Sequence, residues 1–297
     1  MTSAEFTRAL SDWFAANARD LPWRKPVSGH RLDPWHVLVS EFMLQQTQVE
    51  RVIPQYEAWI RTWPRPVDLA AASPADALRM WGRLGYPRRA LWLHRAAGQI
   101  VDRFQGQVPS DPAELESLTG IGPYTARAVS VFAFGQRHPV VDTNTRRVLA
   151  RAVAGLAAAG NPSPTDLVTQ ESVLPDDTAQ SVTVNAAMME LGQTVCTAKR
   201  PRCEVCPIAQ WCQWRLAGYP ENAPKKRPAQ KQFQGSDRQA RGKVMAVLRE
   251  AEHAVSREAA ASAASSDATQ AQRAIDSLLS DGLIVEVSAN KLALPGS

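Results

Sequence analysis

The chain has 297 residues, of which 44% are hydrophobic and 21% are charged. This composition can bury a core, which excludes a wholly disordered protein, and the length suits about two domains of ordinary size. The net charge of +5 favours a polyanionic partner. No apolar stretch is long enough to span a bilayer, and the start carries Glu5 and Arg8 where a signal peptide would be apolar. We therefore expect a cytosolic protein with no membrane partner.

Helix signals dominate the chain from Ser3 to about Leu191. A cap residue followed by proline marks three helix starts, at Asp33-Pro34, Ser73-Pro74 and Asp111-Pro112. Apolar residues then recur at steps of three and four, and no convincing run alternates apolar with polar residues. The sequence predicts an all-α body over residues 1–217 with roughly ten short helices.

The composition changes after residue 217. Residues 218–235 are rich in proline and lysine with almost nothing apolar to bury, which is typical of a linker. Beyond it, the patterns predict helices over 238–250, 257–264 and 268–280, then strands over 283–287 and 291–294. Three helices and a terminal hairpin indicate a small winged-helix-like module over residues 236–297.

All four cysteines fall between residues 196 and 212, with the spacing Cys-x6-Cys-x2-Cys-x5-Cys. A disulfide scaffold would scatter its cysteines across a small secreted chain, so we interpret these as metal ligands. Four thiolates can surround either a tetrahedral zinc ion or an iron-sulfur cluster. Structural zinc more often uses two Cys-x2-Cys pairs, and only one is present, so the spacing favours the cluster. The ligands would be Cys196, Cys203, Cys206 and Cys212.

Basic residues surround this cysteine segment. Between residues 196 and 231 there are eight basic and two acidic residues. Three of the basic residues, Lys199, Arg200 and Arg202, lie on the loop between the first two cysteines. A charge run is often only a solvated face, but a metal-held loop that carries cations is well suited to a phosphate backbone.

A glycine pair precedes one of the predicted helices. Gly120 and Gly122 flank Ile121, and Pro123 then begins the helix. Glycines allow close approach to a ligand, and a helix N-terminus favours an anion, so a phosphate would fit there; an ordinary helix-helix turn is the alternative. One helix later Asp142 and Asn144 stand at another helix start, where Asp142 could be simply a cap.

These motifs, in this order, resemble the helix-hairpin-helix DNA glycosylases that carry an iron-sulfur cluster. Within them, Ser40-Glu41-Phe42-Met43-Leu44-Gln45-Gln46-Thr47, Leu21-Pro22-Trp23-Arg24, Leu84-Gly85-Tyr86 and Met189-Glu190-Leu191-Gly192 resemble the MutY-type adenine glycosylases. The resemblance covers residues 5 to 217. It implies a two-lobed all-α fold, a [4Fe-4S] cluster and adenine excision from duplex DNA.

The resemblance also implies the roles of the catalytic residues. Glu41 would protonate the adenine and Asp142 would stabilise the cationic sugar, with Asn144 and Tyr124 hydrogen-bonding the reacting groups. We expect desolvation to raise the pKa of Glu41, while Asp142 remains ionised at a helix N-terminus. Bifunctional relatives carry a lysine where this chain has Tyr124, so we expect base removal without strand cleavage.

Contacts to the base and to DNA follow from the same resemblance. Trp23, Arg24, Leu44 and Glu190 would bind the adenine, although Arg24 and Glu190 could instead form a salt bridge between helices. When the base is extruded, Gln46 and Tyr86 would fill the gap and wedge between the stacked bases. Tyr86 could instead be an aromatic residue of the core. The Arg88-Arg89 pair after Tyr86 favours DNA. The full set of predicted DNA contacts is Gln46, Thr47, Tyr86, Arg88, Gly120, Gly122, Lys199, Arg200 and Arg202.

The chain departs from the family pattern in two features. Longer relatives carry a Nudix-like C-terminal domain that reads 8-oxoguanine, and its signature is not found here, so this chain is expected to be a short form. Pro87 replaces a second tyrosine of many relatives.

We expect a monomer that acts on double-stranded DNA with a mismatched adenine, near the nucleoid, and leaves an abasic site for a downstream endonuclease.

Two other functions compete with adenine excision. One is a thymine or uracil mismatch glycosylase of the same superfamily, which would share the cluster, the hairpin and the acids. The other is a non-catalytic iron-sulfur DNA-binding regulator, which would need neither Glu41 nor Asp142. Their joint presence favours an enzyme.

Overall fold

The structure is a computed structural model, and it describes residues 4–26, 32–222 and 232–297. The chain divides into two compact units. The first unit takes the described residues of 1–37, 110–116 and 121–227, and the second takes those of 38–109, 117–120 and 228–297. None of the described helices has the length and apolar character needed to cross a membrane.

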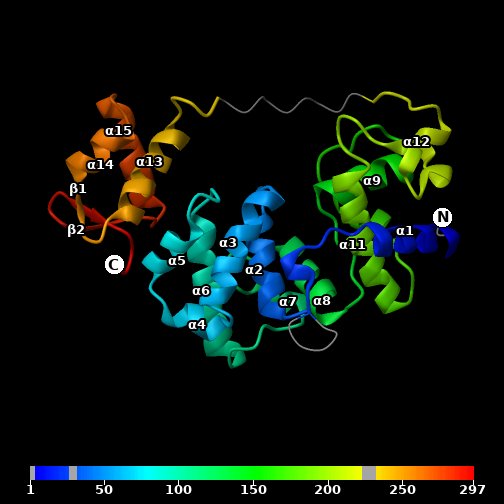
Figure 1. Cartoon of the computed structure of the whole chain (residues 1–297), viewed down its shortest axis with the longest axis horizontal. Helices are drawn as coiled ribbons and strands as arrows, with labels where there is room; N and C mark the ends of the chain where they lie inside the picture. The colour runs from blue at the N-terminus through cyan, green and yellow to red at the C-terminus, as the bar shows by residue number, and fades with distance from the viewer. Residues whose placement is uncertain (1–3, 27–31, 223–231) are drawn as a thin grey trace. The chain divides into compact units, whose positions relative to one another are not determined.

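Helices make up nearly all of the regular structure before residue 217 (Figure 1). The α-helices of this part are α1 (Ala4–Asn17), α2 (Pro34–Leu44), α3 (Val49–Thr62), α4 (Pro66–Ala71), α5 (Pro74–Trp81), α6 (Arg88–Phe104), α7 (Pro112–Glu116), α8 (Pro123–Phe134), α9 (Thr143–Ala152), α10 (Pro164–Glu171), α11 (Thr178–Thr194) and α12 (Gln213–Leu216). Three 3₁₀ turns accompany them, at Pro22–Arg24, Cys203–Val205 and Ala209–Trp211. The described part of this body contains no strand, so the all-α prediction is confirmed. The helices found beyond the roughly ten that were expected are short.

The predicted helix starts are found where a cap residue precedes proline. Asp33 Oδ1 accepts a hydrogen bond from the backbone N of Trp35 at 2.8 Å, and α2 begins at the intervening proline. Ser73 and Asp111 cap α5 and α7 in the same way. Each side-chain oxygen satisfies an N–H that the first helical turn leaves without a partner.

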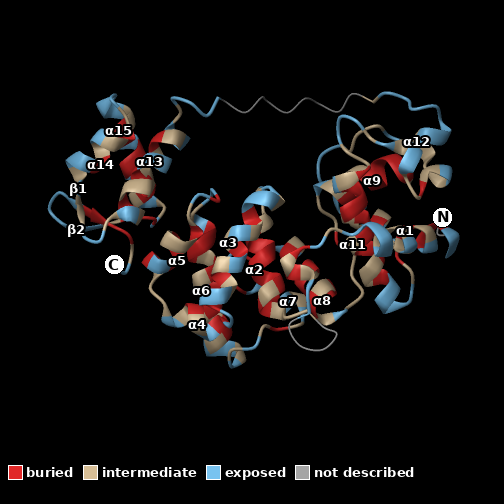
Figure 2. Cartoon of the chain, in the orientation of Figure 1, coloured by how far each residue is buried: buried red, intermediate tan, exposed pale blue. Residues whose placement is uncertain are grey.

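Each unit has its own buried core (Figure 2). In the first unit, α1, α9 and α11 bury Leu10, Val148 and Met188 against one another. In the second unit, the indoles of Trp59 and Trp81 meet edge to face with their centroids 5.7 Å apart, and both are fully buried. The first of these cores fixes α9 and α11, two of the helices that carry candidate site residues.

The C-terminal part contains α13 (Asp237–Glu250), β1 (Val255–Ser256), α14 (Arg257–Ala264), α15 (Ala268–Ser280), β2 (Val285–Ser288) and β3 (Lys291–Ala293). The three predicted helices and the two hairpin strands are found. The strand β1 was not predicted, because two residues are too few to show alternation. It pairs antiparallel with β3 to give the strand order β1-β3-β2. Half of the predicted linker, residues 223–231, lies outside the described residues.

Candidate active site and iron-sulfur site

The start of α9 uses both oxygens of one carboxylate. Asp142 Oδ1 accepts a hydrogen bond from the backbone N of Thr145 at 2.6 Å and so caps the helix. Its Oδ2 accepts from Asn144 Nδ2 at 2.8 Å. The cap interpretation is therefore correct, and the second oxygen is oriented by the other predicted site residue.

Arg147 connects this carboxylate to the cysteine segment. One of its Nη groups donates to Asn144 Oδ1 at 2.8 Å, and its Nε donates to the carbonyl oxygen of Cys196 at 2.6 Å. The same Nη also donates to the carbonyl oxygen of Gly192 on α11. Burial lowers the pKa of Arg147. One guanidinium thus fixes Asn144 against two segments that are distant in the sequence.

Gly192 determines how closely α11 approaches α9. A Cβ atom at this position would lie 2.6 Å from the carbonyl oxygen of Asn144 and 2.8 Å from its Cβ. Such contacts are not tolerated, so only glycine allows α11 to meet the backbone of Asn144. Sequence reasoning did not identify this function of Gly192.

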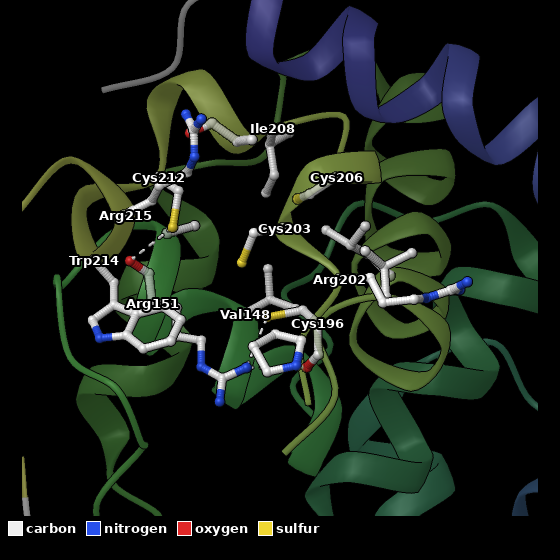
Figure 3. A pocket seen from close by; sticks show the side chains of 15 residues that line it. Val148, Arg151, Cys196, Arg202, Cys203, Cys206, Ile208, Cys212, Trp214 and Arg215 are labelled. Carbon is white, nitrogen blue, oxygen red and sulfur yellow. Dashed lines mark hydrogen bonds between the residues drawn. The ribbon is translucent and has the colours of Figure 1, made fainter. Parts of the chain in front are cut away.

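The four cysteines line one pocket in the first unit (Figure 3). None of them forms a disulfide. Val148, Leu191 and Ile208 line the same pocket with apolar side chains. Among the described residues, no group of three or more His, Cys, Asp or Glu side chains is arranged to hold one metal ion directly. Four cysteine side chains around one space are the donor set that an iron-sulfur cluster takes.

The surroundings of the sulfurs favour ligation over free thiolates. Burial raises the pKa of the Cys206 thiol to about 12, and burial also raises the pKa of Cys212. The thiols of Cys206 and Cys212 need the positive charge of iron to lose their protons, so iron binding releases protons. Arg151 Nη1 lies 3.3 Å from Cys196 Sγ and can donate to that sulfur. When bound, the cluster holds this loop in place.

Glu190 lies on α11 with a fully buried side chain and binds two arginines. Its Oε1 accepts from Arg19 Nε at 2.6 Å, and its Oε2 accepts from Arg24 Nη2 at 2.9 Å. The structure therefore brings Arg24 and Glu190 together as an ion pair. Trp23, the residue before Arg24, is also buried. Arg19 was missed, because no motif marks it.

We expect Glu190→Gln to lower the free energy of unfolding by about 3 kcal/mol at neutral pH, because it removes one partner of a buried ion pair. Burial alone would raise the pKa of Glu190, but the hydrogen bonds and charges of Arg19 and Arg24 hold it below its ordinary value. The stabilisation is therefore complete above about pH 4.5 and is lost as the pH falls through the depressed pKa.

Circular dichroism melting of both proteins between pH 8 and pH 4 checks this prediction. The difference in melting temperature should stay constant down to about pH 5 and then shrink. Asp68→Asn, which removes the partner of the exposed Arg65, serves as a control with little expected effect. A difference that closes between pH 8 and pH 6 would contradict the assignment.

Glu41 and Leu44 lie on α2, and Tyr124 lies on α8. Glu41 is 8% exposed, so its side chain is largely removed from water, as its predicted role as a proton donor requires. Leu44 is half-buried at the C-terminal end of the same helix. Tyr124, on the first turn of α8, packs against the buried cluster around Ala128, Val131 and Val140.

The two glycines of the hairpin have different roles. Gly120 has a φ of +82°, and a Cβ there would lie 2.7 Å from the Cβ of Trp92. Gly122 caps α8 with a φ of −102°, and no atom lies within 4 Å of its ideal Cβ position. Gly120 is therefore required by the backbone, whereas Gly122 leaves open space before a helix N-terminus.

Replacing glycine with alanine is therefore expected to have different effects at the two positions. Gly120→Ala should lower the free energy of unfolding by about 1–3 kcal/mol, because of the left-handed backbone and the clash. Gly122→Ala should leave stability unchanged but weaken binding of duplex DNA by about tenfold, since a methyl group would occupy the space where we expect a phosphate to bind. Melting and binding titrations of both variants test this, and equal effects on stability would refute it.

The structure exposes the two predicted wedge residues. Gln46 and Tyr86 are exposed, with Tyr86 at 54%, so Tyr86 is not a core aromatic. Thr47 is half-buried beside Gln46. Arg88 is also exposed and forms an ion pair with Asp281 at 3.3 Å.

The expectation that the Arg88-Arg89 pair contacts DNA is wrong for its second member. Arg89 is only 3% exposed, and its guanidinium donates inward to backbone carbonyls. The helical period explains this difference, since neighbouring residues on α6 point about 100° apart. The cations of the cysteine loop, Lys199, Arg200 and Arg202, are exposed as predicted.

Comparisons with known proteins agree with this geometry. Residues 39–164 match the HhH-GPD superfamily of base excision DNA repair proteins, and residues 196–212 match the iron-sulfur binding domain of endonuclease III. The chain is 50% identical over 289 residues to an adenine DNA glycosylase of Mycobacterium tuberculosis, covering 97% of this chain and 92% of that one.

Two further relatives place the fold. A thymine/uracil-DNA glycosylase of Pyrobaculum aerophilum is 35% identical over 210 residues, covering 69% of this chain and 89% of that one. The solved structure of a thermostable thymine-DNA glycosylase has a TM-score of 0.62 at 23% identity, covering 71% of this chain and 95% of that one.

The fold and the [4Fe-4S] cofactor are as predicted. With the cysteine pocket, the glycine hairpin and 50% identity to an adenine DNA glycosylase, the chain belongs to the adenine DNA glycosylases, enzymes of the helix-hairpin-helix base excision repair superfamily.

Proposed function

We propose that the enzyme hydrolyses the N-glycosidic bond of adenine mispaired with 8-oxoguanine or guanine, without cutting the DNA strand. The observation that supports this most strongly is the carboxylate of Asp142. One oxygen caps α9 and the other accepts from Asn144, so the group is oriented as an acceptor that can stabilise a cationic sugar. Asn144 in turn is held by Arg147.

Two acids divide the reaction in this proposal. Adenine is a poor leaving group, so Glu41 gives it a proton, while Asp142 stabilises the oxocarbenium-like sugar until water attacks. Tyr124 and Asn144 hydrogen-bond the reacting groups. Tyr124 has no amine and forms no Schiff base, so the product is an intact strand with an abasic site, which a separate endonuclease then processes.

Binding of the base and of the DNA completes the proposal. Trp23, Arg24, Leu44 and Glu190 would bind the extruded adenine. The predicted DNA contacts are Gln46, Thr47, Tyr86, Arg88, Gly120, Gly122, Lys199, Arg200 and Arg202. The enzyme would act as a monomer near the nucleoid, with a catalytic domain over residues 1–217, a linker over 218–235 and a winged-helix-like module over 236–297.

A thymine or uracil mismatch glycosylase is the second candidate, because one such relative is 35% identical over 210 residues. Purified holoprotein is incubated with duplexes that contain adenine opposite 8-oxoguanine, adenine opposite guanine, or thymine opposite guanine. Each product is analysed with and without alkali, and Glu41→Gln protein is treated in parallel. Adenine release with strand breakage only after alkali supports the proposal. Release of thymine alone would support the second candidate. Strand breakage without alkali would contradict the monofunctional mechanism.

A further inference from the structure

Arg89 on α6 is a buried cation that the proposed chemistry does not use. It is 3% exposed, and burial lowers its pKa to about 10, so it remains charged at neutral pH. Burying a charge is costly unless hydrogen bonds satisfy it. All the acceptors that the described residues supply to this guanidinium are neutral oxygens. A charge buried at this cost indicates that its contacts have a specific task.

The first set of contacts surrounds the end of α2. Nη1 of Arg89 donates to the carbonyl oxygens of Phe42 at 2.8 Å, Met43 at 3.2 Å and Gln45. Nη2 donates to Thr47 Oγ1 at 3.0 Å. Helix ends leave carbonyls without partners, and here one guanidinium satisfies several of them. Its contacts lie on both sides of residue 46.

The second set of contacts surrounds the turn before α6. Nη2 of Arg89 also donates to the carbonyl oxygen of Gly85 at 3.1 Å. The guanidinium carbon lies 5.3 Å from the ring centroid of Tyr86 and 5.2 Å from that of Trp81. Trp81 Nε1 donates to the same Gly85 carbonyl at 2.9 Å. Arg89 therefore bridges two turns that are about 40 residues apart in the sequence.

Both turns contain a residue in the left-handed region. Gln46 has a φ of +53° and Tyr86 has a φ of +47°. Residues other than glycine rarely adopt this backbone conformation, and it persists only where the surrounding structure imposes it. Both residues are exposed, so burial of their own side chains does not hold them in this conformation. The contacts of Arg89 lie directly beside each of them.

We propose that Arg89 is a positioning residue that holds the Gln46 and Tyr86 turns together in the geometry needed to enter the DNA stack. The inference rests on the proposed function, because it is there that these two side chains fill and wedge the duplex. Arg89 itself would not touch DNA. Its fork of donors reaches both turns at once, which a lysine ammonium cannot do.

The test compares Arg89→Lys with wild type, and adds Thr47→Val as a milder variant that removes one acceptor. Single-turnover excision is measured on adenine opposite guanine, together with the dissociation constant for that duplex. Extrusion is followed in a Glu41→Gln background by the fluorescence of 2-aminopurine placed next to the mismatched adenine. Arg65→Lys is the matched control, since Arg65 is an exposed arginine at the N-cap of α4.

We expect Arg89→Lys to reduce the single-turnover rate constant and the fluorescence rise by about tenfold or more, with a dissociation constant within about threefold of wild type. Thr47→Val should show a smaller loss of the same kind. A folding defect would instead lower the amplitude of the reaction and leave the rate constant of the surviving molecules unchanged.

Three outcomes would overturn the positioning role. These are an unchanged rate constant, a slower rate with a full fluorescence rise, and an equal loss in Arg65→Lys. Failure of the proposed function is distinguishable from these results. If wild-type protein releases no adenine from any duplex, the proposed function fails, and the fluorescence comparison still tests Arg89. A rise with Glu41→Gln protein that is lost when Arg89→Lys is added supports the positioning role, whereas no rise with Glu41→Gln protein overturns both.

Discussion

Replacing Asp142 with asparagine is expected to reduce the single-turnover rate of adenine release by about 10³-fold, with the fold intact. Oδ1 of this residue caps α9, and asparagine is as good a cap as aspartate, so the helix start is retained. What disappears is the negative charge that, in the proposed mechanism, stabilises the cationic sugar. Removing one electrostatic contact to a transition state costs about 3–4 kcal/mol, which corresponds to this loss of rate.

A matched control separates charge from capping. Asp177 caps α11 in the same way, with its Oδ1 accepting from the backbone N of Gln180 at 2.8 Å. Asp177→Asn should leave both the rate and the melting temperature unchanged. Circular dichroism melting and single-turnover kinetics of both variants give the comparison. Substantial activity in well-folded Asp142→Asn protein would exclude the assigned role.

Local sequence signals were enough to predict several helix starts and the cofactor ligands. Asp33, Ser73 and Asp111 each precede a proline, and each provides the cap that opens its helix. The cysteine spacing likewise predicted the cluster, because its four ligands all lie within residues 196–212. These features depend on neighbours within a few residues, so the sequence contains the information directly.

Long-range burial was much harder to predict. Arg88 and Arg89 are adjacent residues of the same type, yet Arg88 is exposed and Arg89 is buried, with only 3% of its surface exposed. Only the packing of α6 against the end of α2 decides which arginine turns inward. Arg19 was missed for the same reason, since its partner Glu190 lies 171 residues away. A buried glutamate needs cations, but the sequence does not say which ones.

The structure adds to the site a helix contact that no composition or spacing argument predicts. Asn144 is fixed by the Asp142 carboxylate, by Arg147 and by the close approach of α11 at Gly192. Arg147 also bonds to the carbonyl of Cys196, the first cysteine ligand. The Asn144 side chain and the cysteine loop are therefore held by one shared set of contacts within the first unit.

Gly192→Ala is expected to reduce the rate of adenine release by about 100-fold, more than any loss of stability would explain. The added methyl group would lie 2.6 Å from the carbonyl oxygen of Asn144, so α11 or the start of α9 must move. A displacement of about 1 Å in a catalytic group costs about 10²-fold in rate. The free energy of unfolding should fall by about 1–3 kcal/mol.

Gly98→Ala is the matched control, because Gly98 also lies within a helix, α6, and no atom lies within 4 Å of its ideal Cβ position. There alanine should raise stability by about 0.5–1 kcal/mol through helix propensity and leave the rate unchanged. Single-turnover kinetics and melting of the two alanine variants decide the matter. If Gly192→Ala loses stability but keeps its full rate constant, the contact with Asn144 matters for folding and not for catalysis.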